Sequence, residues 1–455
     1  MADLRYFCVV ALACSSPAAT ITVTTGGESG ALTDAPAVTS VMFTAVDETG
    51  ASVTLAQSTL PMTTDINLGD PSQEEVVSIQ LTGTSATGPV VFGATPFAEL
   101  GALSGTSIPL FVQRKGELAR MPGAFPDARA TPLLATTNRA IYVVGGTISG
   151  SQTTPPIGAY DLLLLDQIPD TWAPPQSATS FALVELTEED ADGDLALGVF
   201  IDAQSASVIG LATQILECSD DPTVSPTACT KTGTVTWSTV AGGATVMGPD
   251  GTAYVVGASK TDTPSGSIVM LPPTIFSTGS LATATFSPRQ GAAVAWAPSG
   301  GVFIYGGSSN PETSGVEIIS ATLTPIFNGY QPDGAMGLAA VAFDANDMLI
   351  AGDAAQPRII NLLCDANCMP APWGSALPYA LSSPSLFAIG TATFVIVGDD
   401  STGMTHMFEL TASATTEIPL KIQRQGARAT QTLTGAIVIV GGGCATCATP
   451  ESFVP

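Results

Sequence analysis

The chain has little charge, few basic side chains and a single histidine, and each shortage excludes a class of function. Only 11% of its 455 residues are charged, against about 25% in an average protein. Lys and Arg number 13 against 39 Asp and Glu, a formal net charge of −26. Because phosphate binding requires clustered Lys and Arg, this balance argues against nucleic acid and anionic membrane surfaces as partners. With His406 as the one histidine, a multi-histidine metal site is excluded.

Long apolar runs and long helical patterns are also missing. The longest apolar run at the N-terminus covers residues 6–14, whereas a membrane-spanning helix needs about 20 residues. What recurs instead is a short run of Val, Ile, Ala or Phe bounded by Gly, Pro, Asp or Ser. Such runs predict many short strands, and therefore an all-β fold.

Residues 1–14 have the pattern of an export signal. Arg5 precedes the apolar run, which ends in Ala11-Leu12-Ala13-Cys14. This segment is similar to a bacterial lipoprotein signal, in which cleavage leaves a lipidated cysteine, here Cys14. The alternatives are another export signal or an unprocessed first strand. We expect a protein of the bacterial cell envelope, either an outer-membrane lipoprotein or an extracellular protein, that meets a membrane only through this lipid.

The six cysteines that follow the signal lie in three close pairs. Local pairing predicts the disulfides Cys218–Cys229, Cys364–Cys368 and Cys444–Cys447. Disulfides fit export to an oxidising compartment. For Cys444-Ala-Thr-Cys447 the alternatives are a redox pair or a shared zinc site. Because this motif follows an apolar strand rather than opening a helix, we favour a structural disulfide.

An apolar strand that ends in glycine recurs along the chain. Six copies end at Gly146, Gly257, Gly307, Gly352, Gly398 and Gly442. From Gly257 onward the spacing is between 44 and 50 residues, and a degenerate copy at 195–202 fills the longer gap before Gly257. A fixed period of this length indicates a repeat architecture of seven units.

Each unit has a similar order of segments. An Ala- and Thr-rich strand comes first, then a turn, then the apolar strand, and then a third strand such as 160–165 or 316–319. Several units open with an arginine or close with a tryptophan: Arg129, Arg289 and Arg428, and Trp172, Trp237 and Trp373. This order resembles Kelch-repeat β-propellers, whose period is about 50 residues with four strands per blade. The resemblance implies a seven-bladed propeller over residues 110–455; the alternative is a tandem of β-sandwiches.

The two ends of this region are predicted to meet. The last unit supplies only three strands, at 430–433, 437–440 and 452–454. We therefore expect a strand within 111–121 to complete the last blade and leave no open edge. Residues 20–108 lie outside the repeat, and their short strand patterns predict a small immunoglobulin-like β-sandwich. Kelch lipoproteins of myxobacterial type are similar in this arrangement.

One acidic cluster and one basic set are candidates for binding. Asp190, Asp192 and Asp194 alternate around Gly193, which suits Ca²⁺, although the alternative is a solvated acidic hairpin. We expect no other cofactor. Six basic residues near the predicted closure either form a patch for an anionic glycan or lipid head group or pair with carboxylates: Arg114, Lys115, Arg120, Lys421, Arg424 and Arg428. We interpret His406 as an ordinary strand residue, since one histidine cannot supply the ligands of the Kelch copper oxidases.

These patterns favour a non-enzymatic, monomeric protein whose inter-blade loops bind a protein or a glycan. The first alternative is a carbohydrate-active enzyme with two carboxylates at the mouth of the channel. The second is a structural component of the envelope or matrix. Two carboxylates about 5–10 Å apart between aromatic walls would favour the enzyme, and a polar mouth would favour binding.

Overall fold

The computed structural model describes most of the chain, and the elements formed by its described residues are all strands apart from a short 3-10 helix at Gly257–Ser259. The described residues are 19–59, 65–66, 76–99, 107–151, 155, 157–168, 178–189, 195–203, 212–219, 230–236, 240, 242–261, 263–273, 282–307, 315–330, 335–353, 355–364 and 369–455. The chain divides into two compact units. Unit 1 holds residues up to 24 and 32–112, and unit 2 holds 25–31 and 113–455.

The described residues of unit 1 form two sheets. The smaller has the order β4-β1-β8, and the larger has the order β3-β2-β5-β6, with β7 paired to β5. Their bounds are β1 Ala19–Thr24, β2 Ser40–Asp47, β3 Ser52–Thr59, β4 Asp65–Ile66, β5 Val76–Ser85, β6 Gly88–Ala94, β7 Ala98–Glu99 and β8 Ser107–Phe111. Alternate side chains of β2, namely Val41, Phe43 and Ala45, are buried, as expected for a strand with one face on a core. The pairing of β1 with β8 is parallel.

Among the described residues, unit 2 contains seven four-stranded antiparallel sheets. The first three are β11 Leu133–Thr136, β12 Ala140–Val144, β13 Gly158–Asp161, β14 Asp166–Ile168; β15 Ala178–Glu189, β16 Leu195–Ala203, β17 Ala212–Ser219, β18 Thr230–Thr236; and β19 Ala244–Met247, β20 Ala253–Val256, β21 Ser265–Leu271, β22 Ala282–Arg289. The next three are β23 Ala293–Ala297, β24 Gly301–Tyr305, β25 Val316–Ser320, β26 Pro325–Gly329; β27 Ala339–Ala342, β28 Asp347–Ala351, β29 Arg358–Asn361, β30 Ala371–Pro372; and β31 Ser382–Gly390, β32 Thr393–Asp399, β33 Thr405–Thr411, β34 Thr415–Glu417.

The last sheet combines both ends of the unit. It has the order β10-β37-β36-β35, with bounds β10 Leu118–Arg120, β35 Arg428–Gln431, β36 Ile437–Val440 and β37 Glu451–Phe453. β10 pairs antiparallel with β37, so the strand expected within 111–121 lies near the C-terminal end of that range. Leu118 and Phe453 share a core cluster with Val395 and Val397 of the preceding sheet. The short strand β9, Gln113–Arg114, precedes β10.

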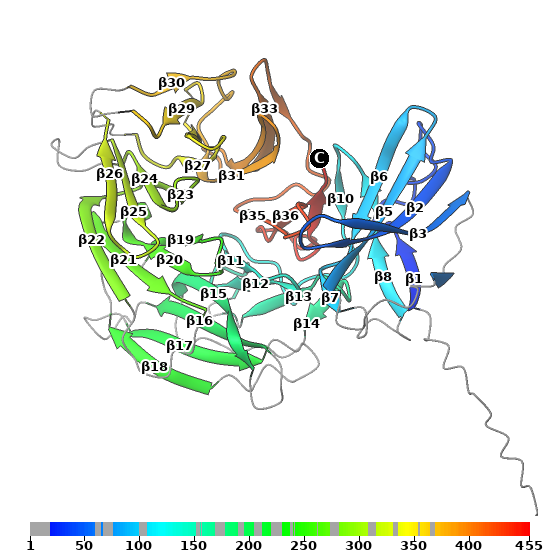
Figure 1. Cartoon of the computed structure of the whole chain (residues 1–455), viewed down its shortest axis with the longest axis horizontal. Helices are drawn as coiled ribbons and strands as arrows, with labels where there is room; N and C mark the ends of the chain where they lie inside the picture. The colour runs from blue at the N-terminus through cyan, green and yellow to red at the C-terminus, as the bar shows by residue number, and fades with distance from the viewer. Residues whose placement is uncertain are drawn as a thin grey trace, which may run out of the picture. The chain divides into compact units, whose positions relative to one another are not determined.

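The seven sheets of unit 2 follow one another around a ring (Figure 1). The first strands β11, β15, β19, β23, β27 and β31 each lie against the first strand of the next sheet, and β35 lies against β11. Four-stranded sheets arranged in this way around a central channel are the organisation of a β-propeller.

The second strand of each sheet is apolar because neighbouring sheets cover both of its faces. Val302 and Ile304 of β24 pack with Tyr254 and Val256 of β20. Phe303 and Tyr305 of the same strand pack with β28 on the other side. Successive side chains therefore enter two different cores. The apolar runs that end in glycine in the sequence are these second strands.

One segment differs from its predicted conformation. The run 160–165 was expected to form a strand, but β13 ends at Asp161 and 162–165 form a turn. The Asp161 carboxylate accepts hydrogen bonds from the backbone N–H groups of Leu163 and Leu164 at 2.7 and 2.9 Å. Aspartate bonds of this local kind favour turns over strands, and they outweigh the apolar character of the leucines.

Candidate functional site

The predicted signal and calcium residues lie outside the described part of the chain. Those residues are Cys14, Asp190, Asp192 and Asp194, and the cysteines Cys229 and Cys368 also fall there. Cys218 belongs to β17, and its side chain is outside the description. Cys364 is disulfide-bonded. Within the described residues, no group of three or more His, Cys, Asp or Glu side chains could hold a metal ion, and no helix is long and apolar enough to cross a membrane.

The predicted disulfide between Cys444 and Cys447 is confirmed. The two sulfur atoms are 1.97 Å apart and the Cα atoms 5.1 Å apart. The pair lies in the loop after β36, and Cys447 is fully buried. The loop is a turn rather than the start of a helix, as expected for a structural bridge.

Three buried arginines each bind the glycine doublet that follows the second strand of a sheet. Arg289 Nη1 donates to the carbonyl oxygens of Gly306 and Gly315, each at 3.1 Å. Its Nε and Nη2 donate to Glu317 of the third strand at 3.2 and 2.9 Å. Burial lowers the pKa of this guanidinium while Glu317 opposes the shift. The arginine thereby binds the Gly306 carbonyl, just after β24, and the Gly315 carbonyl, just before β25, which also accepts the Gly306 N–H.

The same arrangement occurs in the first and last sheets. Arg129 Nη1 donates to the Gly145 carbonyl, and its Nε and Nη2 donate to the Asp127 carboxylate. Arg424 Nη1 donates to the Gly441 carbonyl at 2.7 Å, and its carboxylate is Glu451. Each arginine lies 16 or 17 residues before the first glycine of its doublet.

The sequence pattern had assigned the arginine of the last unit to Arg428. The structure corrects this to Arg424, whose side chain is completely buried, whereas Arg428 is partly exposed. The doublet itself requires glycine because Gly441 and Gly442 have φ of 79° and 120°. Such values are rare for residues that carry a Cβ. Where the second glycine is missing, as after Gly257 and Gly398, an apolar residue stands 17 positions earlier, namely Val240 or Leu381.

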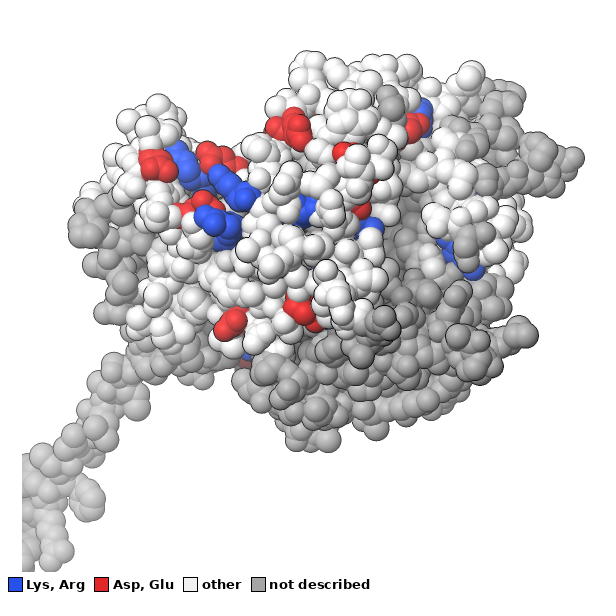
Figure 2. Space-filling view, turned by 180° about the vertical axis from the view of Figure 1, so that it is seen from behind, with Lys and Arg blue, Asp and Glu red and all other residues white. Residues whose placement is uncertain are grey.

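Five of the six basic residues near the closing sheet lie within ion-pair distance of carboxylates. Arg114 and Lys421 approach Glu117, Arg120 pairs with Glu28, Arg424 with Glu451 and Arg428 with Asp399. Lys115 is exposed. On the face shown in Figure 2, Lys and Arg side chains lie beside Asp and Glu side chains instead of forming a continuous basic area. The pairing interpretation of this set therefore holds for five of its six members.

His406 lies on β33 between two carboxylates. Its Nδ1 is 2.8 Å from Glu417 Oε1 and its Nε2 is 3.3 Å from Asp400 Oδ2. The Thr402 hydroxyl, with backbone N–H groups and His406, lowers the pKa of Asp400 to about 2. Tyr379 contacts the imidazole edge to face at a centroid distance of 5.0 Å. Both ring nitrogens thus have partners, as expected for an ordinary strand residue.

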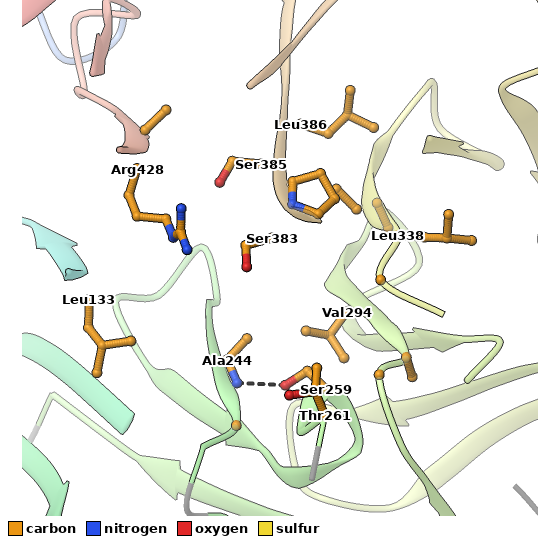
Figure 3. A pocket seen from close by; sticks show the side chains of 18 of the residues that line it. Leu133, Ala244, Ser259, Thr261, Val294, Leu338, Ser383, Ser385, Leu386 and Arg428 are labelled. Atoms are coloured by element: carbon orange, nitrogen blue, oxygen red, sulfur yellow. Dashed lines mark hydrogen bonds between the residues drawn. The ribbon is translucent and has the colours of Figure 1, made fainter. Parts of the chain in front are cut away.

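One cavity of unit 2 lies at the first strands of the sheets and measures about 570 Å³. Six of the seven sheets contribute small or hydroxyl-bearing residues to its wall (Figure 3). The lining comprises Thr131, Pro132, Leu133, Gly242, Gly243, Ala244, Ser259, Thr261, Gly291, Ala292, Val294, Gly337, Leu338, Ala339, Ala340, Ser383, Pro384, Ser385, Leu386, Phe387, Arg428, Ala429 and Thr430. The Ser259 hydroxyl accepts a hydrogen bond from the Ala244 N–H at 2.6 Å and is thereby fixed.

Arg428 is the charged side chain among these described lining residues. Its Nη1 donates to Asp399 Oδ2 at 2.8 Å and to the Ala427 carbonyl at 2.7 Å. Asp399 is buried and also accepts a hydrogen bond from the Thr405 hydroxyl at 2.6 Å. Figure 3 shows the guanidinium extending toward the cavity, with Ser383 and Ser385 close by.

Sequence reasoning did not find this cavity. Its wall consists of the first residues of strands that are up to 299 positions apart, from Thr131 to Thr430. The available signal was the repeated Ala- and Thr-rich first strand, whose small side chains leave space in the channel. Whether Arg424 or Arg428 faces that space depends on partners from other strands, Glu451 and Asp399, which the repeat pattern does not define.

The sheets define the class of this chain as a β-propeller protein with an additional β unit. No family model and no curated protein sequence matches it. Similar solved structures include BBS1N in complex with ARL6DN, soaked with lead, at 10% identity and TM-score 0.32, covering 83% of this chain and 88% of that one. A protein of unknown function from Dyadobacter fermentans matches at 12% identity and TM-score 0.33, with coverages of 67% and 96%. YCF48 bound to D1 peptide matches at 10% identity and TM-score 0.30, with coverages of 66% and 95%.

Proposed function

We propose that this protein is a non-enzymatic binding protein that receives part of its partner in the channel cavity. The observation that carries this proposal is the composition of the cavity wall. It is built from glycine, alanine, serine, threonine and a few apolar residues on six rigid sheets, and its described lining residues include no carboxylate. A cavity of about 570 Å³ is within the range of small-ligand and side-chain binding sites.

The same wall favours binding over the carbohydrate-active alternative. A glycosidase requires two carboxylates that flank the scissile bond. Phe387 is the aromatic residue among the described lining residues, so the aromatic walls expected for sugar stacking are not built there. We therefore propose a protein rather than a glycan as the partner.

We further propose that unit 2 is a seven-bladed Kelch-like propeller and that unit 1 is an immunoglobulin-like sandwich. The seven four-stranded sheets and the adjacency of β35 and β11 support the blade number. The glycine doublets with their buried arginines support the Kelch-like subtype, and the two sheets of unit 1 support the sandwich.

We also propose that the protein is exported and anchored in a bacterial envelope through Cys14. The Cys444–Cys447 disulfide supports export, because such bonds persist in oxidising compartments. Intact-mass and lipid analysis of the native protein tests the anchor: a mass that begins at Cys14 with acyl chains is expected, and an unmodified N-terminus would contradict it.

The binding function is tested by affinity capture with a cavity-filling variant as control. Immobilised wild-type protein is expected to retain a partner from an envelope extract, and Ser385→Trp is expected to lose it because the indole occupies the cavity. A second variant, Lys115→Trp, places an indole on an exposed turn outside the lining and should retain the partner. Equal capture by wild type and Ser385→Trp would contradict the cavity as the binding site.

A further inference from the structure

Toward the described residues, the Arg428 guanidinium forms hydrogen bonds through one of its three nitrogens, Nη1. Nη1 makes both recorded hydrogen bonds, to Asp399 and to the Ala427 carbonyl. Among the described residues, no hydrogen bond is formed by Nε or Nη2. These two atoms form the edge of the guanidinium that matches a carboxylate in a bidentate pair.

A chain of hydrogen bonds fixes Arg428 in place. Asp399 Oδ2 accepts from Nη1, and Asp399 Oδ1 accepts from the Thr405 hydroxyl at 2.6 Å. Thr405 Oγ1 in turn accepts from the Ala427 N–H at 3.0 Å. Because Asp399 is buried and has these partners, the guanidinium does not have to be immobilised when a ligand binds. This preorganisation lowers the entropic cost of binding.

The wall around Arg428 offers further donors but no competing anion. Ser383 and Ser385 come from the neighbouring first strand, and Thr430 from the strand of Arg428 itself. The described lining residues carry no Asp or Glu. The described lining residues carry one cation, Arg428, which is already paired with Asp399. This is too little positive charge for a phosphate of about two charges, but the open edge of the guanidinium fits a planar, singly charged carboxylate.

We propose that the Nε–Nη2 edge of Arg428 binds a carboxylate that the partner inserts into the cavity. This inference deepens the proposed binding function and rests on it for the identity of the cavity as the site. The carboxylate belongs to an acidic side chain or C-terminus of a peptide segment, and a free organic acid offers the same chemistry. The small residues on the wall leave space for the peptide backbone beside the arginine.

The test compares peptides that differ only in the carboxylate. Acetyl-Ala-Glu-Ala-amide is titrated against its Gln counterpart, and acetyl-Ala-Ala-Ala against its C-terminal amide, with propionate as the free acid. Calorimetry and ligand-observed NMR are run on the full chain at about 0.15 M salt, because the net charge of −26 repels anions at low ionic strength. We expect each acid to bind at least about tenfold more tightly than its amide.

Variants assign the effect to the guanidinium edge. Arg428→Gln is expected to lose the acid preference, and Arg428→Lys, which keeps the charge but not the fork, is expected to lose most of it. Arg428→Gln with Asp399→Asn removes both charges together, and this variant keeps the test valid if the single variant unfolds. Lys115→Gln removes an exposed charge outside the lining and should bind as wild type. Equal affinity for acid and amide, wild-type affinity in the Arg428 variants, or no binding of any probe would overturn the inference.

The two proposals fail in different ways. A captured partner that Ser385→Trp loses but Arg428→Lys keeps would leave the binding function standing and remove the carboxylate. Acid binding that depends on Arg428, without any captured partner that depends on the cavity, would support the carboxylate site and contradict the protein-binding function. Binding of propionate but of neither peptide acid would assign the site to a small organic acid and overturn the peptide segment as its ligand.

Discussion

Arg424 and Glu451 form an ion pair in which neither side chain is exposed to solvent. Arg424 Nε lies 2.7 Å from Glu451 Oε2. Glu451 Oε1 accepts the backbone N–H groups of Lys421 and Ile422 at 2.6 and 3.1 Å. Arg424 Nη1 and Nη2 donate to three carbonyls, those of Gly441, Cys447 and Thr449. Glu451 lies on β37, the strand that pairs with β10, so this ion pair holds the strand through which the two ends of unit 2 meet.

Removal of one partner from this pair should strongly destabilise the protein. Arg424→Met leaves a buried carboxylate without its cation, which typically costs about 3–5 kcal/mol. The control is Arg120→Met, whose pair with Glu28 is partly exposed and should contribute no more than about 1 kcal/mol. Denaturant unfolding followed by fluorescence measures the loss of unfolding free energy in both variants. A loss for Arg424→Met as small as that for Arg120→Met would contradict the structural role of the pair.

A methyl group on the first glycine of the last doublet should be more costly than one on a nearby turn glycine. At Gly441, with φ of 79°, a Cβ would lie 2.5 Å from the Arg129 carbonyl oxygen. At Gly435, with φ of 88°, a Cβ would meet nothing within 4 Å. Gly435→Ala should therefore lose only about 1–2 kcal/mol of unfolding free energy, because a residue with a Cβ is strained in the left-handed conformation. Gly441→Ala should lose more. Thermal melting of the two variants measures the difference; equal losses would show that the contact is absent.

Removal of the last strand should abolish cooperative unfolding of unit 2. Truncation after residue 445 deletes β37, and with it the pairing to β10 and the Glu451 carboxylate. The edges of β36 and β10 are then unpaired, and Phe453 leaves its core cluster. We expect a broad thermal transition in place of a sharp one by calorimetry. Unchanged melting of the truncated protein would refute closure through this strand.

The Cys444–Cys447 bridge should make a moderate contribution to stability. It closes a short loop, for which the chain-entropy relation gives about 2 kcal/mol. The double variant Cys444→Ser, Cys447→Ala should lose about this amount of unfolding free energy. The loop also carries the Cys447 carbonyl to which Arg424 donates a hydrogen bond. Wild type treated with a reductant serves as the parallel measurement. A melting temperature that neither treatment lowers would show that Arg424 holds the loop without the disulfide.

Unfolding at alkaline pH should involve Tyr160. Its hydroxyl donates to the Pro122 carbonyl at 2.6 Å, and burial, with Asp166 and Asp161 nearby, raises the pKa of the phenol above its ordinary value of 10.0. The unfolded chain therefore releases this proton first as the pH rises. The contribution of the phenol to the free energy of unfolding is complete below about pH 10. Above that pH it is lost, by at most about 1.4 kcal/mol per pH unit.

Tyr160→Phe isolates this contribution. The variant lacks the hydrogen bond at pH 8, but its unfolding free energy should fall less steeply than that of wild type between pH 9 and 11. Denaturant unfolding at each pH gives the two slopes. Identical slopes would mean that the phenol ionises in the folded protein near its ordinary pKa.

Local patterns were sufficient for much of the fold. The apolar runs that end at Gly257, Gly307, Gly352 and Gly398 became second strands because a strand covered on both faces has to be apolar along its whole length. The strand prediction for the leucine run after Tyr160 was wrong because backbone N–H groups of that run donate hydrogen bonds to the Asp161 carboxylate, and these bonds favour a turn.

The sequence by itself determined the composition-based exclusions, the repeat of short strands and the close cysteine pair at 444 and 447, since each depends on residues near one another in the chain. Only the tertiary structure decided that Arg424 is buried against Glu451 while Arg428, four residues later, faces the cavity. Both roles depend on partners contributed by other strands, Glu451 of β37 and Asp399 of β32. The cavity itself exists only where the first strands of six sheets meet.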